Sequence, residues 1–142
     1  MNIVPFKADH LYQIEVQSAQ VDIRALLPPG AARVLEGTEA FTALDDEGRV
    51  LGCAGVQPLW PGRDLAWAYI SKHAGPHMAG ITRAVRRFLD LRGARRTEMA
   101  VDCGFAAGHR WARLLGFRLE IERMEGYLPD GGAAAQYVRV RA

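Results

Sequence analysis

Three histidines are the first candidates for catalysis or metal binding in this sequence. Imidazole titrates near neutral pH, so a histidine can act as a base or bind a metal. His73 and His77 stand four positions apart, but Gly75 and Pro76 interrupt the segment between them, so the two do not share a helix face. No acidic residue stands beside them in the sequence to orient their rings, as bound and catalytic histidines usually require. We therefore interpret His73, His77 and His109 as solvent-exposed or capping residues, and we expect no metal site.

Tyrosines and acidic residues offer proton donors and bases by residue type alone. Tyr69, Tyr127 and Tyr137 are candidate donors, although a packed ring with a satisfied hydroxyl is the commoner role. Glu39 and Asp64 begin two predicted strands and are candidate bases, but acids at strand ends are common on surfaces. The residues alone therefore identify no catalytic group.

The two cysteines have no second cysteine or histidine at the spacing of a metal site. Cys53 lies among small residues, which predicts a buried strand residue rather than a nucleophile. We expect Cys53 and Cys103 to be free thiols, because their predicted strands flank a third strand and stand roughly 10 Å apart, beyond disulfide reach.

The elements that position these residues follow from the hydrophobic periodicity of the chain. Helices are predicted at an Asp9-capped segment, Val21–Leu27, a segment around Ile81–Leu89 that ends at Gly93, and Ala106–Leu115. Strands are predicted at Asn2–Phe6, Glu39–Leu44, Val50–Gln57, Leu65–Ser71, Thr97–Asp102, Phe117–Met124 and Gln136–Arg141. This order predicts an α/β (α+β) fold in one domain, 1–142, with a mixed, mostly antiparallel sheet of about six or seven strands and helices on both faces.

Glycines inside one predicted strand indicate a close approach by another backbone or a ligand. Gly52 and Gly55 lie within it, and Pro58 follows. Trp60 and Trp67 nearby are assigned to the core. The other expected core residues are Phe88, Leu89, Val101, Trp111 and Leu115.

Composition excludes several classes of protein. The 142 residues are 49% apolar and 24% charged, which is typical of a globular domain and not of a disordered chain. No apolar run approaches the roughly 20 residues of a spanning helix, and no export signal is visible at the N-terminus. Between Arg83 and Arg123 the chain has ten arginines and five acidic residues, which suggests either a solvated helix face or a surface for phosphate.

The order of elements, together with the segment 111–117 (WARLLGF), resembles the GNAT acetyltransferase superfamily. The segment is similar to the end of that family's fourth helix, which closes with leucine, glycine and phenylalanine. A second likeness is to small GNAT-like internal virion proteins of podoviruses. It rests on Trp67 and Ser71, which precede the arginine-rich predicted helix around Ile81–Leu89 (the basic helix), and on the segment after Gly108-His109.

The resemblance implies that acetyl-CoA binds with its diphosphate at the loop before the basic helix, where free N–H groups and the helix dipole attract an anion. The implied cofactor-binding residues are Ile70, Ser71, Lys72, Gly75, Met78, Ala79 and Gly80. The loop departs from the family pattern, because His77 stands where a glycine or alanine is expected and Pro76 has no N–H.

The family's catalytic tyrosine falls on Ala112 and its asparagine on Phe105, so no catalytic residue is implied here. One hypothesis is therefore an acetyl-CoA-dependent N-acyltransferase, acting on an unknown amine, with weak or lost activity. The alternative is a catalytically silent GNAT-fold phage protein that is virion-associated or a binding module, with phage structural proteins as partners. Cytoplasm or a phage particle is the expected location.

A third hypothesis, nucleic-acid binding, depends on the basic helix and its neighbourhood. This region lacks the aromatic residues that single-strand binders interleave with their cations, so nucleic acid is not expected as a partner. Because the chain has no long apolar run, a membrane is not expected as a partner either. The arginines concerned are Arg83, Arg86, Arg87, Arg95 and Arg96.

Overall fold

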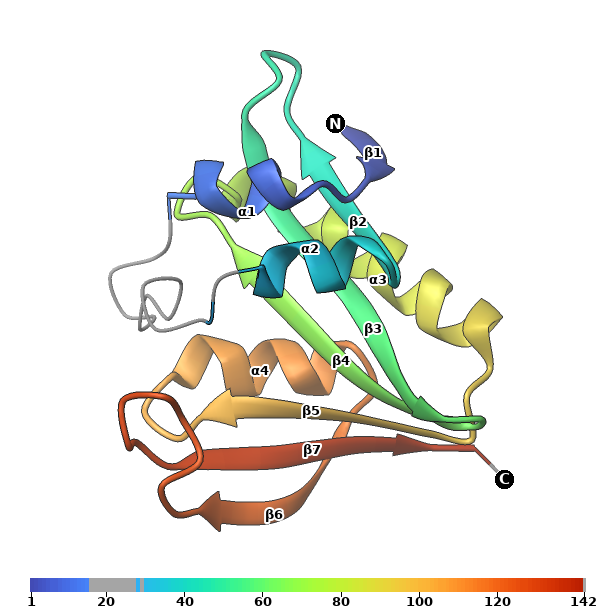
Figure 1. The fold of residues 1–142 in the computed structure, drawn as a ribbon, viewed down its shortest axis with the longest axis vertical. Coiled ribbons are helices and arrows are strands. Elements are labelled where there is room, and N and C mark those ends of the chain that lie inside the picture. Colours follow the sequence, from blue (N-terminus) through green and yellow to red (C-terminus); the bar gives the residue numbers. More distant parts are fainter. Residues whose placement is uncertain (16–27, 29, 142) are drawn as a thin grey trace. The chain divides into compact units, whose positions relative to one another are not determined.

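The computed structural model describes residues 1–15, 28 and 30–141. The predicted helix Val21–Leu27 lies outside the described residues. Seven strands form one sheet in the order β1-β2-β3-β4-β5-β7-β6 (Figure 1). The strands are β1 (Asn2–Pro5), β2 (Glu39–Leu44), β3 (Val50–Trp60), β4 (Arg63–Ile70), β5 (Arg96–Asp102), β6 (Arg118–Met124) and β7 (Ala134–Val140).

Pairing in this sheet is antiparallel between β1 and β2, β2 and β3, β5 and β7, and β6 and β7. The pairing of β4 with β5 is parallel, with Arg63 opposite Arg96 and Leu65 opposite Glu98. The predicted mixed, mostly antiparallel sheet is therefore confirmed. Its described helices are α1 (Ala8–Gln13), α2 (Ala31–Glu36), α3 (Met78–Arg92) and α4 (Ala106–Leu114), with a 3₁₀ turn, η2 (Gly75–His77), before α3.

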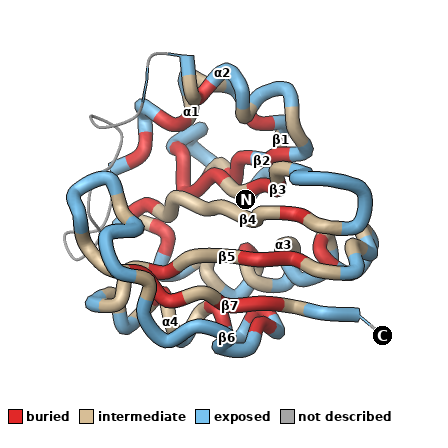
Figure 2. The backbone as a smooth tube through the Cα atoms, turned by 60° about the horizontal axis from the view of Figure 1, so that its bottom comes forward, coloured by how far each residue is buried: buried red, intermediate tan, exposed pale blue. Residues whose placement is uncertain are grey.

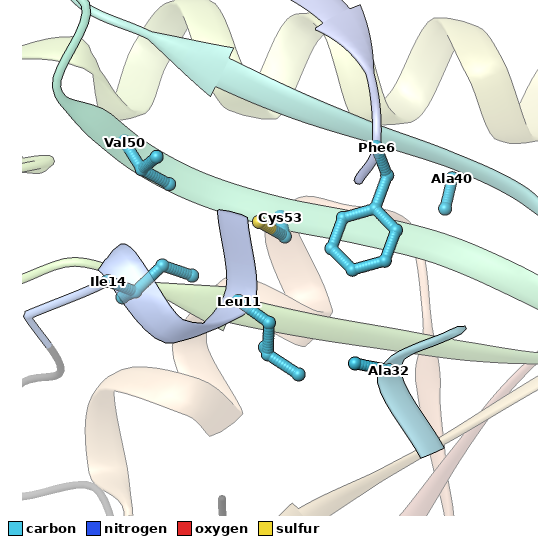
Figure 3. Close-up of a cluster of buried hydrophobic side chains, with 7 residues drawn as sticks. All are labelled: Phe6, Leu11, Ile14, Ala32, Ala40, Val50 and Cys53. Carbon is cyan, nitrogen blue, oxygen red and sulfur yellow. The ribbon is translucent and has the colours of Figure 1, made fainter. Parts of the chain in front are cut away.

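Contacts divide the chain into two compact units, and each has its own core. The first unit comprises Met1–Gln57 and Ala66–Ile81, and the second comprises Pro58–Leu65 and Thr82–Ala142. In the first unit, α1 and α2 lie over β2 and β3 (Figure 1). Buried apolar side chains from these elements meet there (Figure 3): Phe6, Leu11, Ile14, Ala32, Ala40, Val50 and Cys53.

Trp67 packs against this cluster, and its ring meets Phe6 edge-on at 5.3 Å between centroids. The prediction that Trp67 belongs to the core is thus confirmed. Trp60 is different, because its side chain is 55% exposed. The prediction that Trp60 belongs to the core is wrong. Its ring lies at the β3–β4 turn, 4.4 Å from the Arg63 guanidinium, which is a cation–π arrangement that keeps both side chains at the surface.

In the second unit, α4 packs against β5, and α3 contacts α4 through a hydrogen bond from Trp111 Nε1 to Thr82 Oγ1 of 2.9 Å. Among the predicted core residues, Leu89, Val101 and Leu115 are buried, while Phe88 and Trp111 are half-buried. The sequence did not indicate the largest fully buried side chains here, Tyr137 and Val138, which belong to β7, the strand between β5 and β6 (Figure 2).

A buried acid and two arginines tie three strands of the second unit together. Glu98 on β5 is only 4% exposed and accepts hydrogen bonds from Arg63 on β4 and from Arg96. Arg96 also pairs with Glu120 on β6, where Arg96 Nη1 is 2.9 Å from Glu120 Oε2. Arg96, one of the arginines of the basic segment 83–123, is thus bound to acids and is not available to phosphate.

The glycines in β3 mark a close approach, as predicted, and the neighbour of Gly55 is a backbone. A Cβ on Gly55 would stand 2.6 Å from both Ala40 Cβ and Glu39 O of β2. A Cβ on Gly52 would meet Ile70 Cδ1 at 3.0 Å and Tyr69 O at 3.2 Å. These glycines therefore allow tight packing of the first unit's own strands.

Strand β6 has an exposed apolar face. Its apolar residues alternate with charged ones, as in a half-buried strand, but Leu119 is 43% exposed and Ile121 is 40% exposed. Phe117, just before the strand, is buried. The strand is the edge of the sheet, and irregularities between Leu119 and Ile121 and between Ile121 and Met124 interrupt its register with β7. At an edge, alternation does not guarantee a covered inner face.

Short helices were the least predictable elements. The N-cap residue of α1 is Lys7, whereas Asp9, the predicted cap, lies in the first turn of the helix. Helix α2 was not predicted, because proline and glycine at 28–30 are typical of a helix end. Gly30 instead adopts φ +83° and is the N-cap residue of α2. No helix among the described residues is long and apolar enough to cross a membrane.

Candidate functional site

The loop from Ser71 to His77 joins β4 to α3 and is folded tightly on itself. Ser71 is 1% exposed, and its N–H donates to Leu51 O on β3. Its hydroxyl oxygen accepts the His73 N–H at 3.0 Å, and its carbonyl accepts the Ala74 N–H at 3.1 Å. Buried Ser71 therefore fixes where the loop leaves the strand.

Glu15, just after α1, binds the side chains of a lysine and a histidine of this loop. Its Oε2 lies 3.1 Å from Lys72 Nζ and 3.0 Å from His73 Nε2, and its carbonyl accepts the Lys72 N–H at 2.8 Å. Hydrogen bonds from His73 and then Lys72 hold the pKa of the Glu15 carboxyl below its ordinary value. We call this trio, Glu15 with Lys72 and His73, the carboxylate clasp.

The carboxylate clasp corrects the interpretation of His73. The ring does have an acidic partner, but Glu15 is 58 positions away in the sequence. No spacing signal could have indicated it, because the two segments meet only through the fold. His77 has no side-chain hydrogen bond among those found for the described residues and closes the η2 turn.

Most backbone N–H groups of the loop already have acceptors within the chain. The N–H groups of Lys72, His73, Ala74 and His77 donate to protein oxygens, and the Met78 N–H donates to Gly75 O. Gly75 and Ala79 are exposed, and nothing lies within 4 Å of a Cβ placed on Gly75. The space at Gly75 is open, but a diphosphate would find few free donors there, so in this conformation the loop is a poor fit for the group.

The start of α3 is covered from one side by the N-terminal residue. A Cβ on Gly80 would stand 3.0 Å from Met1 Cε, and the Met1 ammonium lies 3.2 Å from Asp46 Oδ1. Ile70, Met78 and Gly80 are half-buried. All seven residues implied as cofactor-binding by the resemblance lie in this one stretch at the end of β4, in the loop and in the first turn of α3.

Helix α4 carries an alanine at its most buried point. Ala112 is 0% exposed, and Gly108 one turn before it is also buried. A Cβ on Gly108 would lie 2.7 Å from the Phe105 ring and 2.8 Å from Val101 Cγ1, so α4 approaches β5 closely. Position 112 therefore offers neither a proton donor nor exposed surface.

His109 and Tyr137 form a hydrogen-bonded pair in the second unit. The Nε2 of His109 is 3.1 Å from Cys103 O, and a carbonyl only accepts, so Nε2 carries a proton. In the neutral ring Nδ1 then accepts from the Tyr137 hydroxyl at 2.8 Å. Tyr137 is 1% exposed, and this satisfied hydroxyl matches the packing role expected for it.

The candidate acids and the cysteines do not supply catalytic groups. Asp64 is 2% exposed and accepts two hydrogen bonds from Arg92, Nε to Oδ2 at 2.7 Å and Nη2 to Oδ1 at 3.1 Å. Burial raises the pKa of the Cys53 thiol to about 11, although a hydrogen bond with Thr42 opposes the rise. Cys53 and Cys103 are both free, as predicted. Glu39 and Tyr127 are exposed.

The described residues contain no group of three or more His, Cys, Asp or Glu side chains that could hold a metal ion. A hollow of about 450 Å³ lies in the first unit, between the start of α1 and α2, and is lined by Lys7, Ala8, Asp9, Arg33 and Glu36. Its charges of both signs are exposed side chains. The hollow lies apart from the carboxylate clasp in sequence and does not include the loop.

Comparison with known proteins identifies the architecture. No protein-family model matches the sequence, and no curated protein matches it either. Solved structures do match. A putative acetyltransferase from Acinetobacter baylyi is 14% identical, with a TM-score of 0.72 over 99% of this chain and 91% of its own. The chain has the GNAT fold.

Two further structures carry the GNAT fold across nearly the same length. A GNAT superfamily phosphinothricin acetyltransferase from Sinorhizobium meliloti, in complex with acetyl-CoA, is 18% identical with a TM-score of 0.66, over 98% of this chain and 87% of its own. A ribosomal-protein-alanine N-acetyltransferase from Brucella melitensis is 16% identical with a TM-score of 0.68, over 99% of this chain and 100% of its own. The likeness to podoviral virion proteins finds no support in these GNAT-fold neighbours.

Proposed function

We propose that this chain is a GNAT-fold acyl-CoA-binding protein that transfers an acyl group to an amine slowly or not at all. One observation carries the proposal. The fold of acetyltransferases, including one in complex with acetyl-CoA, extends over almost the whole chain, while the position of the resembled family's proton donor is the fully buried Ala112. We propose that residues 1–142 act together as one domain in this role.

Binding is expected at the loop between β4 and α3, through Ile70, Ser71, Lys72, Gly75, Met78, Ala79 and Gly80. The internal hydrogen bonds of this loop and the pairing of Lys72 with Glu15 leave few donors for a diphosphate. We therefore expect acetyl-CoA to bind with a Kd of tens to hundreds of micromolar, roughly −5 to −6 kcal/mol.

Transfer of the acyl group is expected to be slow or absent. A positioned proton donor typically contributes about a hundred- to ten-thousand-fold in rate, and alanine cannot donate. Tyr137 on β7 already donates to His109 in the neutral pair. The catalytic contribution that remains is the orientation of the two substrates, which can accelerate attack by the amine without a covalent enzyme intermediate.

Titration calorimetry with acetyl-CoA, beside a thiol-release assay over a panel of primary amines, tests both parts. We expect weak binding and release close to background. Turnover at ordinary enzyme rates would show that another group replaces the donor. Absence of binding at millimolar acetyl-CoA would contradict the proposal.

Two substitutions at one position locate the binding. Gly80→Asp places a carboxylate at the start of α3 and should abolish binding of the anionic cofactor. Gly80→Ala is the matched control, because its Cβ meets only the flexible end of Met1 at 3.0 Å. Equal loss in both variants would indicate a packing defect instead of charge repulsion.

The second candidate function is a GNAT-fold binding module without catalysis, including a role in a phage particle. Burial of Ala112 favours it over an efficient enzyme. A chain that binds acetyl-CoA in calorimetry and releases no thiol with any amine would fit this candidate.

A further inference from the structure

The carboxylate clasp joins an acid to the lysine and the histidine that an anionic ligand of this loop would use. Lys72 is exposed and is the lysine of the loop, and His73 follows it directly. Both side chains donate to the same oxygen of Glu15, at 3.1 Å and 3.0 Å. A carboxylate in this position makes the contacts that one oxygen of a phosphate would make.

We propose that Glu15 is an intramolecular competitor for the phosphate of the ligand, and that His73 is a second hydrogen-bond donor to that phosphate beside Lys72. This inference rests on the proposed function and adds the residue that limits affinity. An incoming phosphate must displace the Glu15 carboxylate from both side chains before it can use them. The measured affinity is the intrinsic affinity reduced by the fraction of molecules in which the clasp is open.

The strength of the clasp sets the size of the effect. Glu15 is exposed, with 58% of its side chain accessible, and exposed ion pairs are modest in strength. Opening it permanently should therefore tighten the binding of an anion by roughly three- to tenfold. The clasp thus regulates affinity and does not block the site.

The backbone gives the clasp a fixed geometry. The Lys72 N–H donates to Glu15 O at 2.8 Å, so a substitution of the Glu15 side chain leaves the main-chain tether in place. Ser71 is buried and holds the other side of the loop. Glu15→Gln should therefore keep the loop where it is and remove only the competing charge.

Binding of two probes, CoA and inorganic diphosphate, tests the proposal by calorimetry at low ionic strength. We expect Glu15→Gln to bind both probes roughly three- to tenfold more tightly than the unmodified protein. Asp9→Asn is the matched control: it removes the same charge from an exposed residue of α1 that does not contact Lys72 or His73, so it should leave both affinities nearly unchanged. Adding Lys72→Met to Glu15→Gln should abolish most of the gain, and adding His73→Phe should abolish part of it.

Each outcome supports or overturns the proposed role of Glu15. Equal or weaker binding in Glu15→Gln, or the same gain in Asp9→Asn, overturns the role of Glu15, as does absence of diphosphate binding in both proteins. A gain that persists without Lys72 overturns the assignment of the two phosphate-binding side chains. If diphosphate shows the expected gain and CoA binds to neither protein, the clasp stands and the proposed cofactor does not.

Discussion

A single acid, Asp64, illustrates how the same residue type leads to opposite conclusions in sequence and in structure. At the start of a strand it was a candidate base, yet it is 2% exposed and bound through both carboxyl oxygens by Arg92. The partner lies 28 positions away at the end of α3, so no local pattern indicated the pair. Paired in this way, Asp64 stabilises the second unit, and its burial keeps it out of reach of a substrate.

Asp64→Asn should destabilise the protein by about 2–3 kcal/mol, because a charged hydrogen-bond partner of a buried group is lost while Arg92 retains some access to water. The urea midpoint of unfolding measures this. Glu125→Gln is the control, since Glu125 pairs with Arg123 at the surface, where side chains are 75% and 59% exposed, and it should shift the midpoint little. Equal shifts would mean that the Asp64 pair is not buried in solution.

At the scale of elements, the sequence predicted the strand bounds and helix ends that depend on residues close together in the chain. Strand Glu39–Leu44 has the predicted bounds, and α3 ends before Gly93, whose φ is +66°. Features that depend on distant segments were missed: α2, the exposed face of β6, and the meeting of Glu15 with the loop. The pattern of residues in β6 is that of a half-buried strand, and only its place at the sheet edge leaves it uncovered.

The two faces of α3 predict contrasting substitutions. Leu89 is 7% exposed and Leu91 is 76% exposed on the same helix. Leu89→Ala should lower the free energy of unfolding by about 2–4 kcal/mol through lost burial and a cavity, and Leu91→Ala by less than about 0.5 kcal/mol. Denaturant unfolding monitored by tryptophan fluorescence compares them. Similar losses would show that α3 is rotated.

Helix α4 predicts a case in which a better helix former is harmful. Gly108→Ala should gain about 1 kcal/mol of helix propensity, but its Cβ would stand within 3 Å of Phe105 and Val101. Overpacking of this kind costs about 1–3 kcal/mol, so we expect a net loss in thermal stability. Gly75→Ala, with nothing within 4 Å of its Cβ, should not lower the melting temperature. A more stable Gly108→Ala variant would contradict the close packing of α4 on β5.

At the scale of the whole molecule, acid should weaken the sheet through one carboxyl. Hydrogen bonds from Arg96 and then Gln136 lower the pKa of Glu120 from 4.5 to about 2. A depressed pKa in the folded state adds stability that is present above pH 4.5 and is lost as the pH falls toward 2. Because the side chain is 27% exposed, the contribution is about 1 kcal/mol.

Glu120→Gln should therefore be less stable than the unmodified protein at pH 7, and the difference should vanish near pH 2. Urea midpoints at pH 7, 4.5 and 2 measure it. Glu122→Gln is the control, because no ion pair of Glu122 is found among the described residues, and it should show no such convergence. A difference that is constant with pH would exclude the pairing with Arg96 as its cause.

The exposed strand β6 has a practical consequence for handling the protein. Its outer edge presents unpaired backbone groups beside Leu119 and Ile121, and what discourages another chain from adding a strand there is the charge of its neighbours and the two breaks in register. Salt screens these charges without touching the packed core. Concentrated samples should thus gel or precipitate first in high-salt buffers, where charge protection is weakest while the fold is still intact.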